Sequence, residues 1–348
     1  MFNNRHYVPV LKGKRAEFPA LGALKSTVAM TPLIEAVPSG WKEVPKRMAE
    51  SAQWPNESRY FLDFLFIDDP DDTEEADESH PVRQCFAEVA KRGQRAIPVT
   101  GLARSPGYQS AIRQVVSEQG NGLAIRLSAD DFEDSETLDE AIEAVADFFG
   151  QERSEIDLFL DHGSVATLSS SGVAQMYRAN IDLIPNLEDW RTLTVASAAF
   201  PPGLGPLERY QWNSAMRTDW RGWVKLVTGP RPPIRVPAFG DYAIAQPELP
   251  PEGRATILAQ LRYATPDSWL IWKGGNVFKH QEGFDQFLEI CKSLVKKDEY
   301  RGRDFSQGDA EIFAKATNGG SPGNAESWRR IGTNHHVETV LDQIANLP

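Results

Sequence analysis

The stretch from Gly122 to Leu160 reads GLAIRLSADDFEDSETLDEAIEAVADFFGQERSEIDLFL and contains one complete strand–helix–strand unit. The apolar runs at Gly122–Leu127 and Ile156–Leu160 predict two buried strands. Between them, behind an acidic first turn that suits a helix N-terminus, apolar residues recur at helical spacing. These residues are Leu138, Ile142, Val145 and Phe149. Strands that alternate with helices in this way predict a parallel sheet.

The same alternation continues along the chain in both directions. Eight repeats favour closure into a (β/α)8 TIM-type barrel over residues 1–245, and an open doubly wound sheet is the alternative. The eight predicted strands are Tyr7–Leu11, Thr31–Val37, Tyr60–Ile67, Ala96–Gly101, Gly122–Leu127, Ile156–Leu160, Thr192–Ala199 and Arg235–Ala243. Between the last two strands, Leu207, Tyr210 and Ala215 weakly suggest a helix.

Residues 246–348 form a C-terminal extension that we expect to pack on the barrel. Prolines and glycine mark a linker at Pro247, Pro250, Pro251 and Gly253. Beyond the linker we predict a helix at Arg254–Ala264, a strand at Ser268–Trp272, a helical stripe from Phe284 to Val295 and a short helix at Ala310–Ala316.

Composition limits the classes of function. No apolar run approaches the roughly 20 residues of a membrane helix, no signal peptide precedes Tyr7, and two cysteines make no disulfide framework. These features predict a cytoplasmic protein without membrane contact. The net charge of −12 argues against broad nucleic-acid binding. An acidic run over residues 68–78 predicts a solvated loop or, alternatively, a contact surface for a basic protein partner.

Charged residues interrupt or follow the predicted strands at their carboxyl ends, where barrel enzymes build their active sites. Strand alternation places Arg126 inside the barrel, opposite to Ile125 and Leu127. Cations there, together with Asp63, are candidates for binding an anionic small molecule or nucleotide, and the other carboxylates are candidates for acid–base work. Alternatively, ion pairs of Arg126 with Asp63 or Glu35 only fill a polar core. The candidates are Lys12 and Lys14 after the first strand, Glu35, Asp63, Arg126, Asp161 and Asp241 on later strands, and Lys273 after a further apolar run.

Two structural predictions follow for these candidates. Lys12, Glu35, Asp63, Arg126 and Asp241 should converge on one cavity, because each follows or interrupts an apolar strand.

The second prediction concerns Asn334-His335-His336, in a motif that the sequence predicts to be a polar, glycine-flanked turn. This segment is too polar to fold alone, so it should dock on the barrel. At least one histidine should then reach Asp161 or Asp241 and serve in catalysis, with Asn334 in substrate binding, because imidazole titrates near neutral pH. A hydrogen-bonded structural cap is the alternative.

No metal or cofactor is identified from the sequence. Glu35, Asp63, Asp161, His162 and Asp241 are of metal-ligand type, but their spacing matches no metal motif. The glycines of Gly203-Leu-Gly205 and Gly319-Gly320 lack the strand–helix spacing of a dinucleotide loop, and Gly-x-Ser-x-Gly is absent.

Several motifs resemble the beta protein family of bacteria and phages. They are Tyr7-Val-Pro-Val-Leu-Lys-Gly-Lys-Arg-Ala-Glu17, Thr31-Pro-Leu-Ile-Glu35, Pro237-Ala-Phe-Gly-Asp-Tyr242, Phe305-Ser-Gln-Gly-Asp309, Gly323-Asn324 and Gly332-Thr-Asn-His-His336. Over residues 40–230 only the alternation of predicted strands and helices matches the family. Gln307 stands where the family usually has an aromatic residue. The resemblance implies a prokaryotic or phage origin and a role in phage–host conflict, and it assigns chemistry to no residue.

Two hypotheses follow. The protein is a hydrolase acting on a phosphorylated or nucleotide-like substrate, or it is a non-catalytic partner-binding module of a defence or counter-defence system. An exposed barrel mouth with convergent charges would favour the enzyme, and a filled barrel with a large exposed patch would favour the module.

Overall fold

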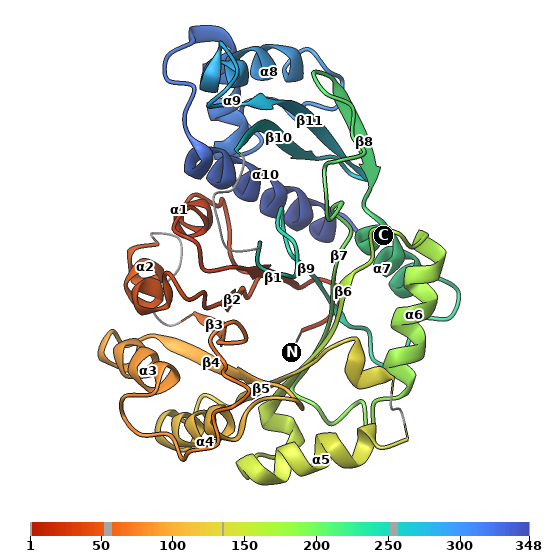
Figure 1. Cartoon of the computed structure of the whole chain (residues 1–348). Helices are drawn as coiled ribbons and strands as arrows, with labels where there is room; N and C mark the ends of the chain where they lie inside the picture. Colours follow the sequence, from red (N-terminus) through yellow and green to blue (C-terminus); the bar gives the residue numbers. More distant parts are fainter. Residues whose placement is uncertain (1, 52–57, 134–135, 251–256, 348) are drawn as a thin grey trace.

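Eight parallel strands close into a barrel in the computed structural model, which describes residues 2–51, 58–133, 136–250 and 257–347 (Figure 1). The strand order is β1-β2-β3-β4-β5-β6-β7-β9, and the ring closes where β9 pairs with β1. The predicted TIM-type barrel is therefore confirmed. Its strands are β1 Tyr7–Leu11, β2 Leu33–Glu35, β3 Arg59–Asp63, β4 Arg95–Thr100, β5 Leu123–Leu127, β6 Ile156–Ser164, β7 Thr192–Ala198 and β9 Ala238–Asp241.

Helices follow most of these strands and lie around the barrel (Figure 1). None of the described helices combines the length and apolar character needed to cross a bilayer. The α-helices are α1 Glu17–Gly22, α2 Val44–Glu50, α3 Pro81–Lys91, α4 Pro106–Gln119, α5 Leu138–Phe149, α6 Ser170–Asp182 and α7 Thr218–Thr228, with short 3-10 turns at Trp41–Glu43, Asp130–Phe132 and Arg153–Glu155.

Strand alternation divides the apolar core into two layers. On β5, Leu123, Ile125 and Leu127 belong to the outer layer, between strands and helices. Ala124 lies in the inner layer with aliphatic and aromatic residues from the other strands. The interior of the barrel is therefore a packed core rather than a channel, as is usual for this fold.

The extension adds a three-stranded antiparallel sheet in the order β10-β11-β8, together with three helices. Its strand β8 comes from the range predicted for the barrel, yet it pairs with β11. The elements are β8 Trp212–Met216, β10 Leu258–Ala264, β11 Ser268–Asn276, a 3-10 turn at Gly283–Asp285, α8 Gln286–Leu294, α9 Gln307–Asn318 and α10 Ala325–Ala345.

Two predicted helices are wrong, because both segments contribute strands to the sheet of the extension. In β10, Ala259, Leu261 and Tyr263 are buried while the residues between them are partly exposed, which is the period-two pattern of a strand. The first residues of the predicted helix at Arg254–Ala264, like Pro251 and Gly253 of the linker, lie outside the described residues. The segment Leu207–Ala215 contributes to β8 instead of a helix.

Helix α10 joins the two parts of the molecule (Figure 1). It packs against α1 and β1 of the barrel and against α9 and β10 of the extension. The motif Asn334-His335-His336 lies inside this helix, so the predicted glycine-flanked turn is wrong. Burial on all sides explains the error, because a helix that contacts neighbours all round shows no apolar stripe in its sequence.

Candidate functional site

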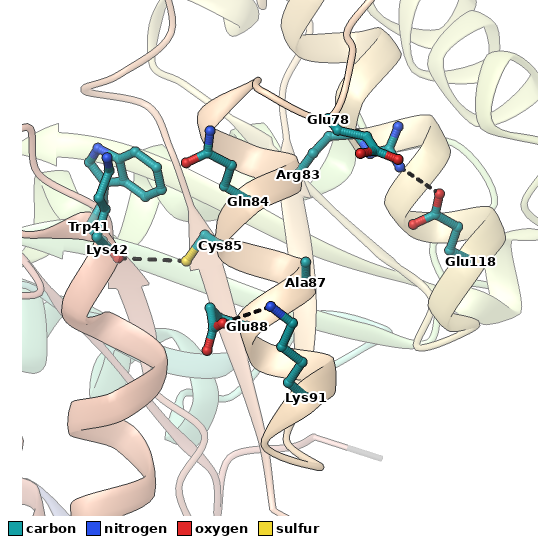
Figure 2. Close-up of a pocket in the computed structure, with 10 residues that line it drawn as sticks. All are labelled: Trp41, Lys42, Glu78, Arg83, Gln84, Cys85, Ala87, Glu88, Lys91 and Glu118. Atoms are coloured by element: carbon teal, nitrogen blue, oxygen red, sulfur yellow. Dashed lines mark hydrogen bonds and ion pairs between the residues drawn. The ribbon is translucent and has the colours of Figure 1, made fainter.

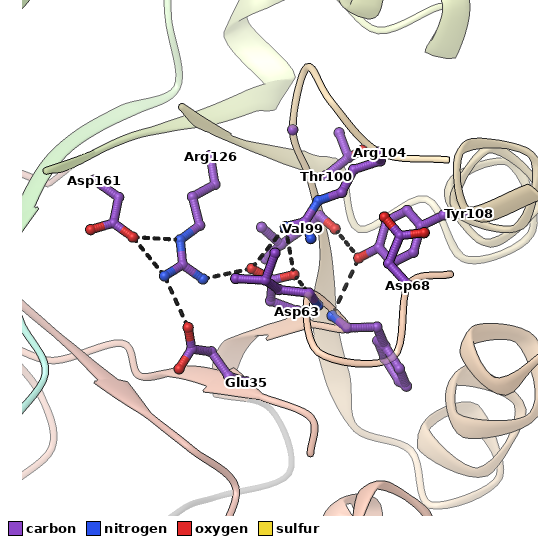
Figure 3. Close-up of polar contacts among 12 residues, drawn as sticks. Glu35, Asp63, Asp68, Val99, Thr100, Arg104, Tyr108, Arg126 and Asp161 are labelled. Atoms are coloured by element: carbon purple, nitrogen blue, oxygen red, sulfur yellow. Dashed lines mark hydrogen bonds and ion pairs between the residues drawn. The ribbon is translucent and has the colours of Figure 1, made fainter. Parts of the chain in front are cut away.

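Arg126 is the centre of a buried ionic cluster at the carboxyl ends of the strands (Figure 3). Its Nη1 donates to Asp63 Oδ2 at 2.7 Å, and its Nη2 donates to Glu35 Oε1 at 2.9 Å. Nε and Nη2 both donate to Asp161 Oδ2, at 2.9 and 2.6 Å. Each guanidinium nitrogen is thus engaged, and the side chain orients carboxylates from β2, β3 and β6.

Two further cations and a tyrosine complete the cluster. Lys12 Nζ lies 2.6 Å from Glu35 Oε2 and also donates to the Pro247 carbonyl. Arg104 Nη2 lies 2.9 Å from Asp63 Oδ1, and the Tyr242 hydroxyl donates to Asp161. The mouth cluster, as we call it, therefore balances three cations against three carboxylates: Lys12, Arg104 and Arg126 with Glu35, Asp63 and Asp161.

Local backbone geometry holds these side chains in place. Gly13 has φ +61°, and a Cβ there would lie 2.9 Å from the Glu35 carbonyl oxygen, so only glycine lets the chain turn so close to β2. Asp63 Oδ1 accepts the Leu65 N–H at 2.9 Å, and Asp161 Oδ1 accepts the Gly163 N–H at 3.1 Å. Such turns fix each carboxylate at the end of its strand.

Burial and neighbouring charge set the protonation of the cluster. Burial raises the pKa of Glu35, against the opposing effect of Arg126 and Lys12. Burial lowers the pKa of Lys12, against the effect of Glu35. Burial alone would raise the pKa of Asp161, but the charge of Arg126 and the hydrogen bonds from Arg126, Tyr242 and Gly163 together hold that pKa below its usual value. Asp161 therefore stays ionised, while the proton affinities of Glu35 and Lys12 approach each other.

Asp241 does not converge with the other candidates, so this part of the prediction is wrong. Gly240 faces the barrel interior beside Ala196 and Thr194, and Tyr242 belongs to the inner layer. Asp241, between them, must therefore point outward. There it accepts the Tyr7 hydroxyl at 2.6 Å, and His336 Nε2 lies 2.6 Å from its other oxygen.

The predicted contact of a C-terminal histidine with Asp241 is thus confirmed, but it lies beside helix α10 and not in the barrel mouth. Burial lowers the pKa of His336, against the effect of Asp241. Burial alone would raise the pKa of Asp241, but His336, the Tyr7 hydroxyl and the charge of Arg217 together lower that pKa. We infer a neutral imidazole that donates from Nε2 to an ionised carboxylate. The buried Nδ1, which has no hydrogen-bond partner in the described residues, fits this tautomer.

His335 and Asn334 point to different neighbours, because consecutive residues of a helix diverge by about 100°. His335 Nδ1 lies 2.8 Å from Asp309 Oδ2, and its Nε2 lies 2.8 Å from the Ala264 carbonyl oxygen. Asn334 Nδ2 donates to Ala20 O at 3.1 Å, and its Oδ1 accepts from Gly308 N at 2.9 Å. These contacts fasten α10 to the barrel and to the extension.

Three other polar side chains singled out in the sequence also lie outside the mouth cluster. Lys273, on β11, donates to the carbonyl oxygens of Gly205 and Leu207 at 2.9 and 2.6 Å. Lys14 follows the Gly13 turn and is partly buried. His162 faces away from Asp161, and burial lowers its pKa to about 4.

The candidates predicted from the sequence do not include Arg104 and Tyr242. Arg104 lies four residues beyond the end of β4, in the loop that starts at Gly101, so a search limited to strand ends misses it. Tyr242 follows Asp241 directly. Its inward direction could have been predicted from strand alternation if Gly240 had been placed inside.

A surface hollow of about 520 Å³ lies away from the mouth cluster, on the outer side of α3 (Figure 2). Trp41, Arg83 and Cys85 are among its lining residues. Burial raises the pKa of the Cys85 thiol, whose Sγ lies 3.6 Å from the Trp41 carbonyl oxygen, so the hollow contains no activated thiolate. In the described ranges no three His, Cys, Asp or Glu side chains are placed to hold a metal ion.

The fold and the site place the protein in a class of closed (β/α)8 barrels that carry charged side chains at the carboxyl ends of the strands and an extension of strands and helices. The family model described as Beta protein matches residues 7–342, so the chain belongs to the beta protein family. Comparisons with curated proteins and with solved structures give no match.

Proposed function

We propose that the protein is an enzyme, of the hydrolase class, that acts on an anionic, phosphorylated or nucleotide-like substrate at the barrel mouth. The observation that supports it is the mouth cluster itself, with ionisable groups from β1, β2, β3, β5 and β6. Burying ions is costly, and apolar replacements of buried ion pairs are often neutral or stabilising by about 1–4 kcal/mol. Stability alone therefore gives little reason for such a cluster at the end where barrel active sites lie.

In this proposal Lys12 and Glu35 are the catalytic pair. The pKa of Glu35 is raised and that of Lys12 is lowered, both toward neutral pH, so Glu35 serves as general acid or base. The Lys12 ammonium has three donors and contacts two acceptors in the described part of the chain, Glu35 and the Pro247 carbonyl. Its third donor would bind an anionic group of the substrate. Arg126 and Tyr242 position Asp161 and Glu35.

A non-catalytic partner-binding module is the second candidate. It is favoured by the charge balance and deep burial of the mouth cluster, in which Lys12 is 2% and Arg126 7% exposed. It is also favoured by the acidic run over residues 68–78, which is mostly exposed and would attract a basic partner. Family membership suggests phage–host conflict as the setting for either candidate, and two buried free cysteines fit a reducing cytoplasm.

Mass spectrometry of small molecules released from the purified protein by denaturation tests the proposal. We expect wild type to carry a phosphorylated compound that Lys12→Met loses, because that variant removes the free donor. The matched control Lys46→Gln, at an exposed lysine of α2, should carry the same compound. A compound retained by Lys12→Met would contradict binding at the mouth, and a co-purified basic protein in place of any compound would favour the module.

A further inference from the structure

A crevice between the barrel and the extension has the features of an anion site. It encloses about 420 Å³ and is bordered by β10, α8, the beginning of α10 and the segment after β9. Arg262 from β10 and Arg329 from α10 line it, together with the apolar side chains Ile244, Phe287 and Trp328. The crevice therefore combines two cations with an apolar wall, as ligand sites commonly do.

Arg262 has no carboxylate partner among the described residues. It donates to the Ile244 carbonyl, and its guanidinium lies 4.2 Å from the centre of the Phe200 ring. The Gln260 amide, turned so that its oxygen faces Arg262, accepts from its Nε at 2.9 Å. All three partners are neutral, so the charge of this partly buried cation is not offset by the protein.

Arg329 adds a second positive charge to the crevice, and Lys14 lies near enough to Arg329 and Arg262 to interact with both charges. Arg329 Nη1 has a loose ion pair with Glu17 Oε1 at 3.5 Å, while the nearby Glu326 carboxylate is engaged by Arg15 at 3.1 Å. Among the described residues, Glu17 is thus the one buried carboxylate that pairs with a cation of this group, and its partner is Arg329.

The electrostatic effect of this crowding is visible in both titrating cations. Burial, followed by the charge of Arg329, lowers the pKa of Arg262 to about 9. Burial, followed by Arg329, also lowers the pKa of Lys14, and Lys12 and Arg262 add to the shift. Like charges held together at partial burial are unfavourable unless an anion offsets them.

We propose that this crevice binds the phosphate group of a phosphorylated ligand through Lys14, Arg262 and Arg329, with the rest of the ligand against Ile244 and Trp328. The segment after β9 borders the crevice with Ile244 and accepts a hydrogen bond from Lys12 at the Pro247 carbonyl, so the crevice adjoins the mouth cluster. The inference rests on the proposed function in taking this ligand to be the substrate. Phosphate binding itself does not require turnover, and the two failures are therefore distinguishable.

Isothermal titration calorimetry with inorganic pyrophosphate at low salt tests the site. Because a hydrogen bond to a charged group contributes about 1.5–3 kcal/mol, Lys14→Gln and Arg329→Gln should each weaken binding about tenfold or more. Lys14→Arg, which keeps the charge, should bind within a few-fold of wild type. Lys46→Gln, at an exposed lysine of α2, should bind like wild type.

Thermal unfolding of each variant checks that it is folded. No pyrophosphate binding by wild type, or equal binding by wild type and both Gln variants, would overturn the inference. Normal pyrophosphate binding without any turnover would leave the crevice in place and count only against the enzyme proposal.

Discussion

Arg126→Met separates the structural contribution of the mouth cluster from its chemistry. After the substitution, Glu35 keeps Lys12 and Asp63 keeps Arg104 as ionic partners. Asp161 keeps only the Tyr242 hydroxyl and the Gly163 N–H, so it becomes the one carboxylate of the cluster without a cation. Removing one partner of a buried ion pair costs about 3–5 kcal/mol, and we expect a loss of that size in the free energy of unfolding.

The pH dependence of this loss identifies Asp161 as its source. In wild type the pKa of Asp161 is lowered, so its stabilising effect is present above its unfolded value and is lost as pH falls through the folded value. In Arg126→Met the opposing charge of Arg126 is gone and only the hydrogen bonds from Tyr242 and Gly163 still counter burial, so the pKa of Asp161 rises. The destabilising effect then disappears as the carboxyl gains a proton. The stability difference between wild type and variant should therefore narrow from about pH 7 to about pH 5.

Urea unfolding followed by tryptophan fluorescence measures both effects, and the double variant Arg126→Met/Asp161→Asn provides the control. Because the amide introduced by Asp161→Asn carries no charge, the double variant should be more stable than the single variant at neutral pH. A loss below about 1 kcal/mol for Arg126→Met would refute the reasoning, since surface ion pairs contribute that little. A difference that widens at low pH would also refute it.

Three further predictions follow from the contacts described. His336→Ala should destabilise the protein by about 2–4 kcal/mol, because it opens a cavity and leaves Asp241 with the Tyr7 hydroxyl but no imidazole donor. Protease cleavage between the barrel and the extension should increase. Unchanged cleavage would argue against α10 as the element that joins them. Tyr242→Phe removes a hydroxyl that donates to Asp161 and should cost about 1–3 kcal/mol in chemical unfolding, whereas a neutral effect would remove Tyr242 from the cluster. Once a substrate is identified, the acidic limb of the pH–rate profile should lie above the usual carboxyl range, because the pKa of Glu35 is raised. The basic limb should lie below the usual lysine range, because the pKa of Lys12 is lowered. Limbs at the ordinary values of about 4.3 and 10.4 would contradict the assignment of Glu35 and Lys12 as the catalytic pair.

Much of the barrel follows from its sequence because parallel strands are buried on both faces and read as short apolar runs. Arg126 could be placed inside the barrel for the same reason, since Leu123, Ile125 and Leu127 face the helices. The extension was harder to predict. Its strands β8 and β10 are partly exposed, and β8 pairs with residues more than fifty positions away, which no local pattern indicates.

The membership of the mouth cluster also depends on distant contacts. Arg126 meets Glu35 across 91 residues and Tyr242 across 116, so the sequence supplies the charged residue types but not their pairing. Asp241 shows the limit of reading strand ends alone. Because neighbouring residues of a strand point to opposite faces, the Asp241 side chain points toward His336. The uncharged next residue, Tyr242, points into the barrel instead.

Turnover by wild type and Glu35→Gln, side by side, tests most directly whether the mouth cluster is catalytic. Each protein is incubated with a bacterial metabolite extract, and loss of phosphorylated compounds is followed by mass spectrometry, with Lys46→Gln as the control. General acid–base catalysis typically contributes about 10²–10⁴-fold, so we expect wild type and Lys46→Gln to consume a compound that Glu35→Gln consumes at least about a hundredfold more slowly. Equal consumption by wild type and Glu35→Gln, or none by wild type, would contradict an active site at the barrel mouth.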